Sequence, residues 1–227
     1  MTFHIITIFP RIFDSYFNES IIKRAQAGGQ AKIKIYNLRD WTTDRHKTVD
    51  DVPYGGGAGM VMKIEPLYKA LKDITTPQIR GARGVKNQKI ILLSAKGKRW
   101  TQQLAQKHSK LEDMVLICGR YEGVDERISK LIDEEISIGD YVLTGGEIGA
   151  LAIVDSITRL IPGVLGNRES LKDESHTEPG VLEYPQYTRP EVFEIEGKKY
   201  RVPKVLLSGD HKKIEDWRKS KMKRIKK

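Results

Sequence analysis

The segment IGDYVLTGGEIGA, residues 138–150, guides the interpretation of the whole sequence. Gly139, Gly145, Gly146 and Gly149 all fall within it, among mainly apolar neighbours. Glycine gives a core no side chain to pack and costs backbone entropy on folding, so soluble cores rarely concentrate it in this way. The cluster therefore predicts that some group approaches the backbone closely here.

Two similar turns come earlier in the chain. SAKGKRW follows an apolar strand predicted at 89–93, and CGRYEGVDER follows one at 114–118, while LTGGEIGA is placed after a third at 141–143. Ligands of open parallel sheets bind beyond the carboxyl ends of the strands. A single glycine often does no more than turn the chain. Three such turns together predict one pocket with walls of backbone.

The common nucleotide and hydrolase motifs are missing from the sequence. It contains no GxGxxG, GxxxxGK[ST], GxSxG or HExxH, and the glycines of YGGGAGM (54–60) have the wrong spacing for a phosphate loop. A P-loop NTPase and a standard dinucleotide-binding dehydrogenase are thereby excluded. No histidine pair has metal-ligand spacing and Cys118 is the only cysteine, so we predict neither a metal site nor an intrachain disulfide.

Strand and helix patterns alternate along most of the chain. Apolar strands are predicted at 3–9, 31–37, 89–95 and 114–120, and helices at 10–28, from Pro66, at 100–108, 125–132 and 147–161. This order predicts an α/β fold with a parallel sheet. Residues 38–64 form a long polar loop, expected to be functional or disordered, and 75–88 a flexible connection.

The composition of the 227-residue chain is that of a soluble protein. It has 39% hydrophobic and 31% charged residues, and no apolar run reaches the roughly 18 residues that span a bilayer. The start, MTFHIITIFPRIF, lacks the basic region and cleavage site of a signal peptide. We therefore expect a cytoplasmic protein without a membrane partner.

Most of the net charge of +10 lies at the C-terminus. Residues 212–227 hold nine lysines and arginines and two acidic residues, a net charge of +7, on a helix predicted at 212–226. Such a tail is typical of contact with phosphate backbones, and equally of a solvated, frayed terminus. Because the amino-acid composition changes after Gly163, we predict a domain at 1–162, a linker at 163–179 and a small, mainly helical C-terminal domain at 180–227.

Six segments carry a resemblance to a known family. RHKTVDDVPYGGGAGM, CGRYEGVDERI, SIGDYVLTGGE, DSITRLIPGVLGN, YTRPEVFE and VPKVLLSGDH, in this order, resemble the bacterial tRNA (guanine-N1)-methyltransferases over nearly the whole chain. That family belongs to the trefoil-knotted (SPOUT) methyltransferases. The resemblance implies a deep knot that binds S-adenosylmethionine, a homodimer, and methylation of the tRNA guanine immediately 3′ of the anticodon.

The resemblance also implies the residues that hold the methyl donor. They fall in three segments of this chain, whose main-chain groups are expected to recognise the adenine and the ribose. Tyr121 and Glu122 are expected to flank the donor, and Ile138 and Leu143 to form apolar walls. The expected donor-binding residues are Leu93, Ser94, Gly119, Tyr121, Glu122, Gly123, Ile138, Gly139, Tyr141, Leu143, Gly145 and Gly146.

Catalysis requires removal of the N1 proton of guanine, which a carboxylate can accept while a guanidinium stabilises the charge developing at O6. The arginine of the family matches Arg159, which could instead form an ion pair with Asp155. In an alignment without gaps, the position of the family's catalytic aspartate is occupied by Glu174 in this chain. Because this is a departure from the family, Asp173 is the alternative base.

The loop at 44–60 supplies the expected substrate contacts His46, Asp51 and Gly59. His46 is a candidate base or base-edge contact, or a surface histidine, and Asp51 is a candidate contact or simply the cap of a turn. Two functions of different classes remain: a tRNA methyltransferase, and a non-enzymatic RNA-binding protein on the same fold. The glycine loops and Arg159 favour the methyltransferase, because a protein that only binds RNA needs no donor pocket.

Overall fold

A computed structural model describes residues 1–75, 87–166 and 174–225. The chain divides into two compact units, Met1–Gly166 and Asn167–Lys227, which are described separately below. The predicted domain boundaries at 162 and 179 remain predictions. Among the described residues, no helix is long and apolar enough to cross a membrane.

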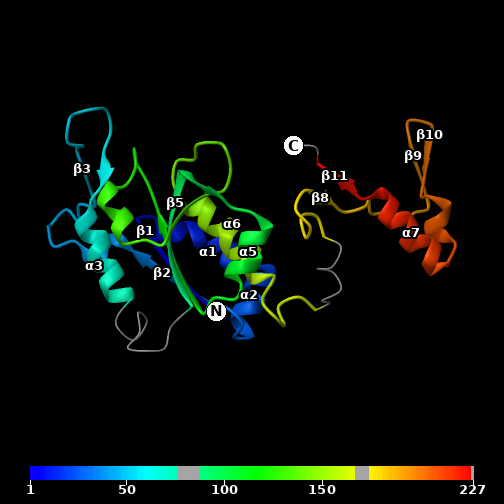
Figure 1. The fold of residues 1–227 in the computed structure, drawn as a ribbon, viewed down its shortest axis with the longest axis horizontal. Coiled ribbons are helices and arrows are strands. Elements are labelled where there is room, and N and C mark those ends of the chain that lie inside the picture. Colours follow the sequence, from blue (N-terminus) through cyan, green and yellow to red (C-terminus); the bar gives the residue numbers. More distant parts are fainter. Residues whose placement is uncertain (76–86, 167–173, 226–227) are drawn as a thin grey trace. The chain divides into compact units, whose positions relative to one another are not determined.

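The first unit is built on a five-stranded parallel sheet, as the alternating pattern predicted (Figure 1). The strand order is β2-β1-β6-β5-β7. The bounds are β1 Thr2–Thr7, β2 Lys32–Asn37, β5 Gln88–Arg99, β6 Asp113–Cys118 and β7 Glu134–Ser137.

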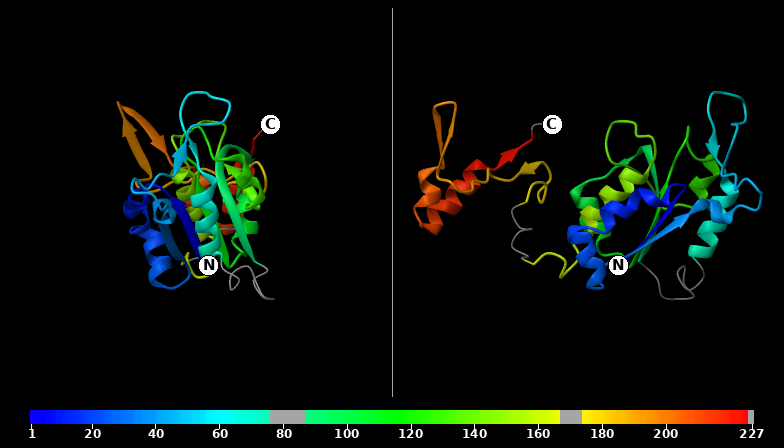
Figure 2. Two further views of the ribbon diagram at one scale, coloured as in Figure 1. Left: turned by 90° about the vertical axis from the view of Figure 1, so that its left-hand side faces the viewer. Right: turned by 180° about the vertical axis from the view of Figure 1, so that it is seen from behind.

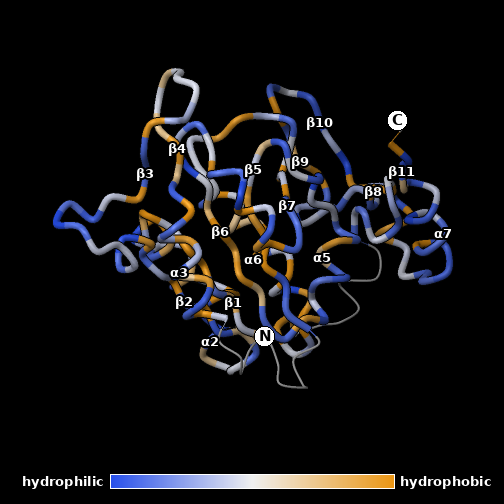
Figure 3. The backbone as a smooth tube through the Cα atoms, turned by 60° about the vertical axis from the view of Figure 1, so that its left-hand side comes forward, coloured by the Kyte–Doolittle hydropathy of each residue, from blue (hydrophilic) through white to orange (hydrophobic). Residues whose placement is uncertain are grey.

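Helices cover both faces of this sheet. The hydrophobic core on one face contains side chains of four α-helices, α1 (Asp14–Phe17), α2 (Ser20–Ala27), α5 (Gln102–His108) and α6 (Glu147–Thr158). The core on the other face contains side chains of α3 (Ile64–Ile74) and of the 3-10 helices η2 (Leu38–Trp41) and η3 (Glu126–Lys130). Within β6, Met114 and Leu116 enter the first core, whereas Val115 and Ile117 enter the second. Burial on both faces explains why this strand is continuously apolar, and Figure 3 shows its hydrophobic path.

Two strand predictions near the glycine turns were wrong. The third strand is β7 at 134–137, whereas residues 141–143 lie in a loop. SAKGKRW does not turn after residue 93, because β5 continues to Arg99 and pairs with β7 again at Lys98 and Arg99, after a register shift. A Cβ on Gly97 would lie 2.5 Å from the backbone nitrogen of Ile136, so this second pairing requires glycine.

The helix predicted at 10–28 is divided into three pieces. A 3-10 helix, η1 (Pro10–Phe13), leads into α1, and α2 begins at Ser20, whose φ of 49° interrupts the helical path. The helix predicted at 147–161 ends at Thr158. The loop at 38–64 is ordered around η2 and a short hairpin of β3 (Asp50–Asp51) and β4 (Val61–Met62). Of the connection predicted at 75–88, residues 76–86 lie outside the described residues.

The second unit contains more strand than the predicted, mainly helical domain. Its antiparallel pairs are β8 (Val181–Leu182) with β11 (Lys223–Arg224) and β9 (Val192–Ile195) with β10 (Lys198–Arg201), alongside η5 (Lys204–Leu207) and α7 (His211–Lys221), drawn from yellow to red in Figure 2. The basic helix ends at Lys221, five residues before the prediction, because the chain turns there to pair β11 with β8.

Candidate functional site

A cavity of about 410 Å³ lies beside the register shift of β5 and at the carboxyl ends of β6 and β7. Three loops form most of its wall: the bulge of β5 near Leu93, the turn after β6, and the loop between β7 and α6. The structure brings all twelve expected donor-binding residues into this lining, although they come from three separate segments. Its volume is within the range of small-molecule sites. The role of each residue toward a ligand remains a prediction.

Two glycines of the pocket loops, Gly146 of the opening segment and Gly119, are required first by the chain itself. A Cβ on Gly146 would lie 2.8 Å from Cys118 Cα, and one on Gly119 would lie 3.0 Å from the carbonyl oxygen of Leu93. The N–H of Gly146 donates to the carbonyl of Gly119 at 2.9 Å. The group that approaches these backbones is therefore another loop of the same pocket, and the glycines allow the loops to pack against one another.

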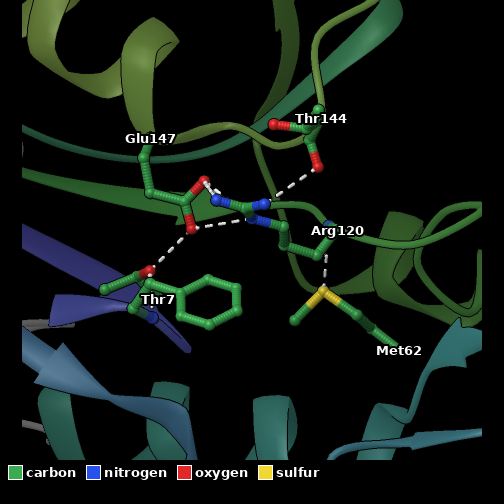
Figure 4. A network of polar contacts seen from close by, with 6 residues as sticks. Thr7, Met62, Arg120, Thr144 and Glu147 are labelled. Atoms are coloured by element: carbon green, nitrogen blue, oxygen red, sulfur yellow. Dashed lines mark hydrogen bonds and ion pairs between the residues drawn. The ribbon is translucent and has the colours of Figure 1, made fainter. Parts of the chain in front are cut away.

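A buried ion pair joins two of these loops (Figure 4). The guanidinium of Arg120 donates to both carboxylate oxygens of Glu147, with its Nε at 3.2 Å from Oε1 and its Nη2 at 2.9 Å from Oε2. The Glu147 side chain is 2% exposed and that of Arg120 is 17% exposed. The hydroxyl of Thr7, at the end of β1, donates to Glu147 at 2.8 Å, and Arg120 NH1 donates to the carbonyl of Thr144 at 3.2 Å.

This network links the end of β1, the turn after β6 and the start of α6. The Arg120 guanidinium also lies 4.6 Å from the ring centre of Phe9. The backbone N–H of Arg120 donates to the sulfur of Met62, with 3.2 Å between nitrogen and sulfur. Burial, and after it the charge of Glu147, raise the pKa of the Cys118 thiol well above its usual value. That thiol is therefore a packing group of the core.

The loop at 38–64 reaches the rim of the cavity. A Cβ on Gly59 would meet the side chain of Glu122 at 2.5 Å, and the N–H of Glu122 donates to the carbonyl of Met60 at 3.0 Å. Tyr121 has a left-handed backbone, with a φ of 60°. Its pKa is raised by burial and then by the Asp50 carboxylate. Of the expected substrate contacts, Gly59 is thus next to the predicted donor residues.

The other expected substrate contacts lie elsewhere on this loop. His46 is exposed in a turn in which the N–H of Lys47 donates to the carbonyl of Asp44 at 3.1 Å. Asp51 is exposed in β3, and its carboxylate accepts from the N–H of Val52 at 2.8 Å. Neither is among the cavity-lining residues.

The expected catalytic residues are divided between the two units. Arg159 is the half-buried C-cap of α6, and its N–H donates to the carbonyl of Asp155 at 3.2 Å. Glu174 opens the described part of the second unit, where its carbonyl accepts from the N–H of Thr177 at 3.1 Å. Asp173 lies outside the described residues.

Sequence reasoning missed Arg120, Glu147 and Thr7, although they hold the pocket loops together. One signal was available, because Glu147 is the only charged residue in TGGEIGALAIV, and a carboxylate in such apolar surroundings requires a partner. In the three ranges described, no group of three or more His, Cys, Asp and Glu side chains is placed to hold a metal ion.

Residues 1–227 match the protein family described as tRNA (Guanine-1)-methyltransferase TrmD. A protein of Clostridioides difficile (strain 630), named tRNA (guanine-N(1)-)-methyltransferase, is 53% identical over 226 residues, which cover 99% of this chain and 94% of its own. Relatives with the same name in Dictyoglomus turgidum and Geobacter sp. (strain M21) are 54% and 49% identical, covering 94% and 99% of this chain and 82% and 86% of their own.

Proposed function

The chain belongs to the tRNA (guanine-1)-methyltransferase family, and we propose that it transfers a methyl group from S-adenosylmethionine to N1 of the guanine immediately 3′ of the anticodon. The names of the curated relatives favour this enzymatic function over a protein that only binds RNA. The observation that carries the proposal is the single cavity that gathers all twelve expected donor residues.

The cavity has the chemistry that such a donor requires. Leu93 and Ile138 give it apolar surface, and the turns at Gly119 and Gly146 present main chain to it. When bound, S-adenosylmethionine supplies an electrophilic methyl group. The Arg120–Glu147 pair fixes the two loops from which most of the lining comes, so that the site is formed before the donor enters.

The trefoil knot belongs to the same proposal. The segment before α6 packs onto the turn after β6, through the Gly146–Gly119 hydrogen bond and an antiparallel bridge between Arg120 and Gly145. Close packing of these loops is consistent with a chain threaded through a loop of itself.

The protein's own part in the chemistry is proton transfer. N1 of guanine carries a proton and is a poor nucleophile at neutral pH, so a carboxylate has to remove that proton. We assign this role to Glu174, with Asp173 as the alternative, and assign stabilisation of the charge developing at O6 to Arg159. His46, Asp51 and Gly59 are the proposed contacts to the RNA.

The proposed assembly is a cytoplasmic homodimer with tRNA bound. Its parts are a donor-binding domain at 1–162, a linker at 163–179, and a tRNA-binding domain at 180–227. Arg159 and Glu174 belong to different units of the chain. A dimer would allow a catalytic centre to draw on residues of two copies.

The function is tested by methyl transfer from a labelled donor to tRNA transcripts. Transcripts with guanine immediately 3′ of the anticodon should be methylated at N1, and transcripts with adenine in that position should not. Equal labelling of both would contradict the proposed target, and absence of labelling with both would contradict the proposed activity.

The base is tested with Glu174→Gln and Asp173→Asn, each measured in single-turnover methylation across pH. Loss of the true base should slow the reaction roughly 100-fold, with little change in donor binding. If only Asp173→Asn is slow, the ungapped alignment to Glu174 is wrong. If neither variant is slow, the base lies outside this segment and His46 is the next candidate.

A further inference from the structure

The second unit has a cavity of its own, of about 880 Å³, between the segment at 184–191, η5 and α7. The lining includes the aliphatic side chains of Val202, Leu206 and Ile214. It also includes three aromatic rings and two arginines. These are Tyr184, Tyr187, Trp217, Arg189 and Arg218. The family assignment gives this cavity no role, and the cavity of the first unit does not share any of its residues.

One aromatic ring of this cavity, that of Tyr187, remains accessible. The centroids of Tyr187 and Trp217 are 6.3 Å apart with an interplanar angle of 56°, and the Arg218 guanidinium lies 5.0 Å from the ring centre of Tyr184. Tyr187 is 49% exposed, although it lines a cavity with an aliphatic wall. Exposed aromatic rings and guanidinium planes are the surfaces on which unstacked bases of RNA stack, and this cavity has an exposed ring in Tyr187 and an exposed guanidinium in Arg218.

The charge around the cavity indicates the same kind of ligand. Helix α7, which contributes Trp217 and Arg218, also carries the exposed lysines Lys212 and Lys221. A ligand for this surface combines a flat apolar group with an anionic chain. Single-stranded nucleic acid has both, because each base with its π-face is followed by a phosphate.

We propose that the cavity of the second unit holds an unpaired nucleobase of the RNA substrate, stacked on Tyr187, while lysines of α7 contact the adjoining phosphates. The proposal rests on the proposed function for the presence of tRNA. It adds a base-binding site separate from the donor cavity, so that part of the RNA affinity comes from stacking and is insensitive to salt.

Tyr187→Leu tests the proposal, because it keeps apolar volume and removes the flat ring. Its affinity for a tRNA transcript should fall about tenfold with an unchanged salt dependence, whereas Tyr187→Phe should bind like the wild type. Tyr200→Leu is the matched control, since Tyr200 is 47% exposed on β10 in the same unit and does not line the cavity. A fully paired RNA duplex should bind all four proteins equally.

Arg218→Lys provides a second measurement that does not depend on the folding of Tyr187→Leu. Arg218 is exposed, and the substitution keeps its charge while removing the planar guanidinium, so tRNA affinity should fall severalfold with the same salt slope. The proposal is overturned if Tyr187→Leu and Arg218→Lys bind tRNA like the wild type, or if Tyr200→Leu loses as much affinity as Tyr187→Leu. Failure of the wild type to methylate tRNA would instead refute the proposed function and leave this binding comparison valid.

Discussion

At the start of α6 the Glu147 carboxylate is buried between a threonine hydroxyl and a guanidinium. A buried carboxylate is tolerated only when it is paired and hydrogen-bonded, and here each oxygen has a partner. The pair sets the distance between the turn after β6 and the loop before α6, and both loops line the cavity proposed to bind the donor. Residue-scale electrostatics thus determine the shape of the site.

Glu147→Gln should weaken donor binding and lower the stability of the first unit. The change leaves the largely buried Arg120 without its counter-charge, which costs about 3 kcal/mol of unfolding free energy. Thr7→Val is the comparison variant, because it removes a neutral hydroxyl, which donates to Glu147 and accepts from the N–H of Phe9, and should cost about 1 kcal/mol for each hydrogen bond. Titration calorimetry with S-adenosylmethionine and chemical unfolding measure the two effects. Wild-type donor affinity in Glu147→Gln would show that the pair does not shape the cavity.

His4 should make the first unit less stable at acidic pH. It is 2% exposed, and burial, together with the nearby Lys34, lowers its pKa below the ordinary 6.5, against the opposing effect of Asp113. The unfolded chain therefore binds a proton at His4 more readily than the folded chain, so this contribution to stability is complete above pH 6.5 and is lost as the pH falls below it.

The measurement is the free energy of unfolding between pH 7.5 and pH 5, a range chosen to span the ordinary histidine pKa of about 6.5. Replacing the histidine in His4→Gln should flatten the decline. His46→Gln, a change at an exposed histidine of the loop at 44–60, should leave it as steep as in the wild type. Parallel curves for His4→Gln and the wild type would assign the decline to other groups.

At the scale of elements, the end of α7 is decided by strand pairing. The basic composition continues to Lys227, yet the helix ends at Lys221 and the next residues pair with β8. Deletion of residues 219–227 would therefore remove β11 along with the charge. Single substitutions separate these effects, and Lys213 and Lys219 are poor choices because they form ion pairs with Asp210 and Glu215.

Lys212→Gln with Lys221→Gln should weaken tRNA binding and flatten its salt dependence. For every phosphate that the protein no longer neutralises, the slope of log affinity against log salt should fall by roughly one. Donor affinity should not change, since α7 lies in the second unit. The control is Lys23→Gln, an exposed lysine of α2. Unchanged slopes in the double variant would identify the basic helix as solvated surface.

At the scale of the whole molecule, the apolar helix α6 offers little exposed surface to the proposed dimer interface. Most of α6 is buried within the first unit, including Ile153, Val154 and Ile157. The exposed large apolar side chain of α6 is Ile148, at 57%, with Ile12 and Tyr16 on the neighbouring η1 and α1 at 40% and 43%. Tyr16 is joined to α6 through a hydrogen bond to Asp155, so these side chains belong to adjacent elements.

Ile148→Glu should therefore produce a monomer with little methyl transfer, because a charge cannot be buried unpaired in an apolar interface. Light scattering at micromolar concentration gives the mass, and labelled-donor transfer gives the activity. Tyr68→Glu, on α3 and 51% exposed, should remain dimeric. A fully active wild-type monomer would exclude the dimer.

The sequence by itself determined the parallel α/β class and the twelve residues that come to line one cavity. Strands such as β6 are continuously apolar because they are buried on both faces, and this burial is visible in composition alone. The glycine turns were recognisable because glycine is used where no side chain fits. The family resemblance then converted these turns into a set of named donor contacts.

Only the tertiary structure decided what the glycines contact and where the third strand runs. The local sequence pattern favoured a third strand at 141–143. The strand β7 forms instead at 134–137, because β5 offers a partner there on both sides of its register shift. The partners of Glu147 are 140 and 27 residues away in the chain, at Thr7 and Arg120. The sequence around Glu147 indicates that its carboxylate needs a partner but not which residue that partner is, because the pairing depends on which segments the fold brings together.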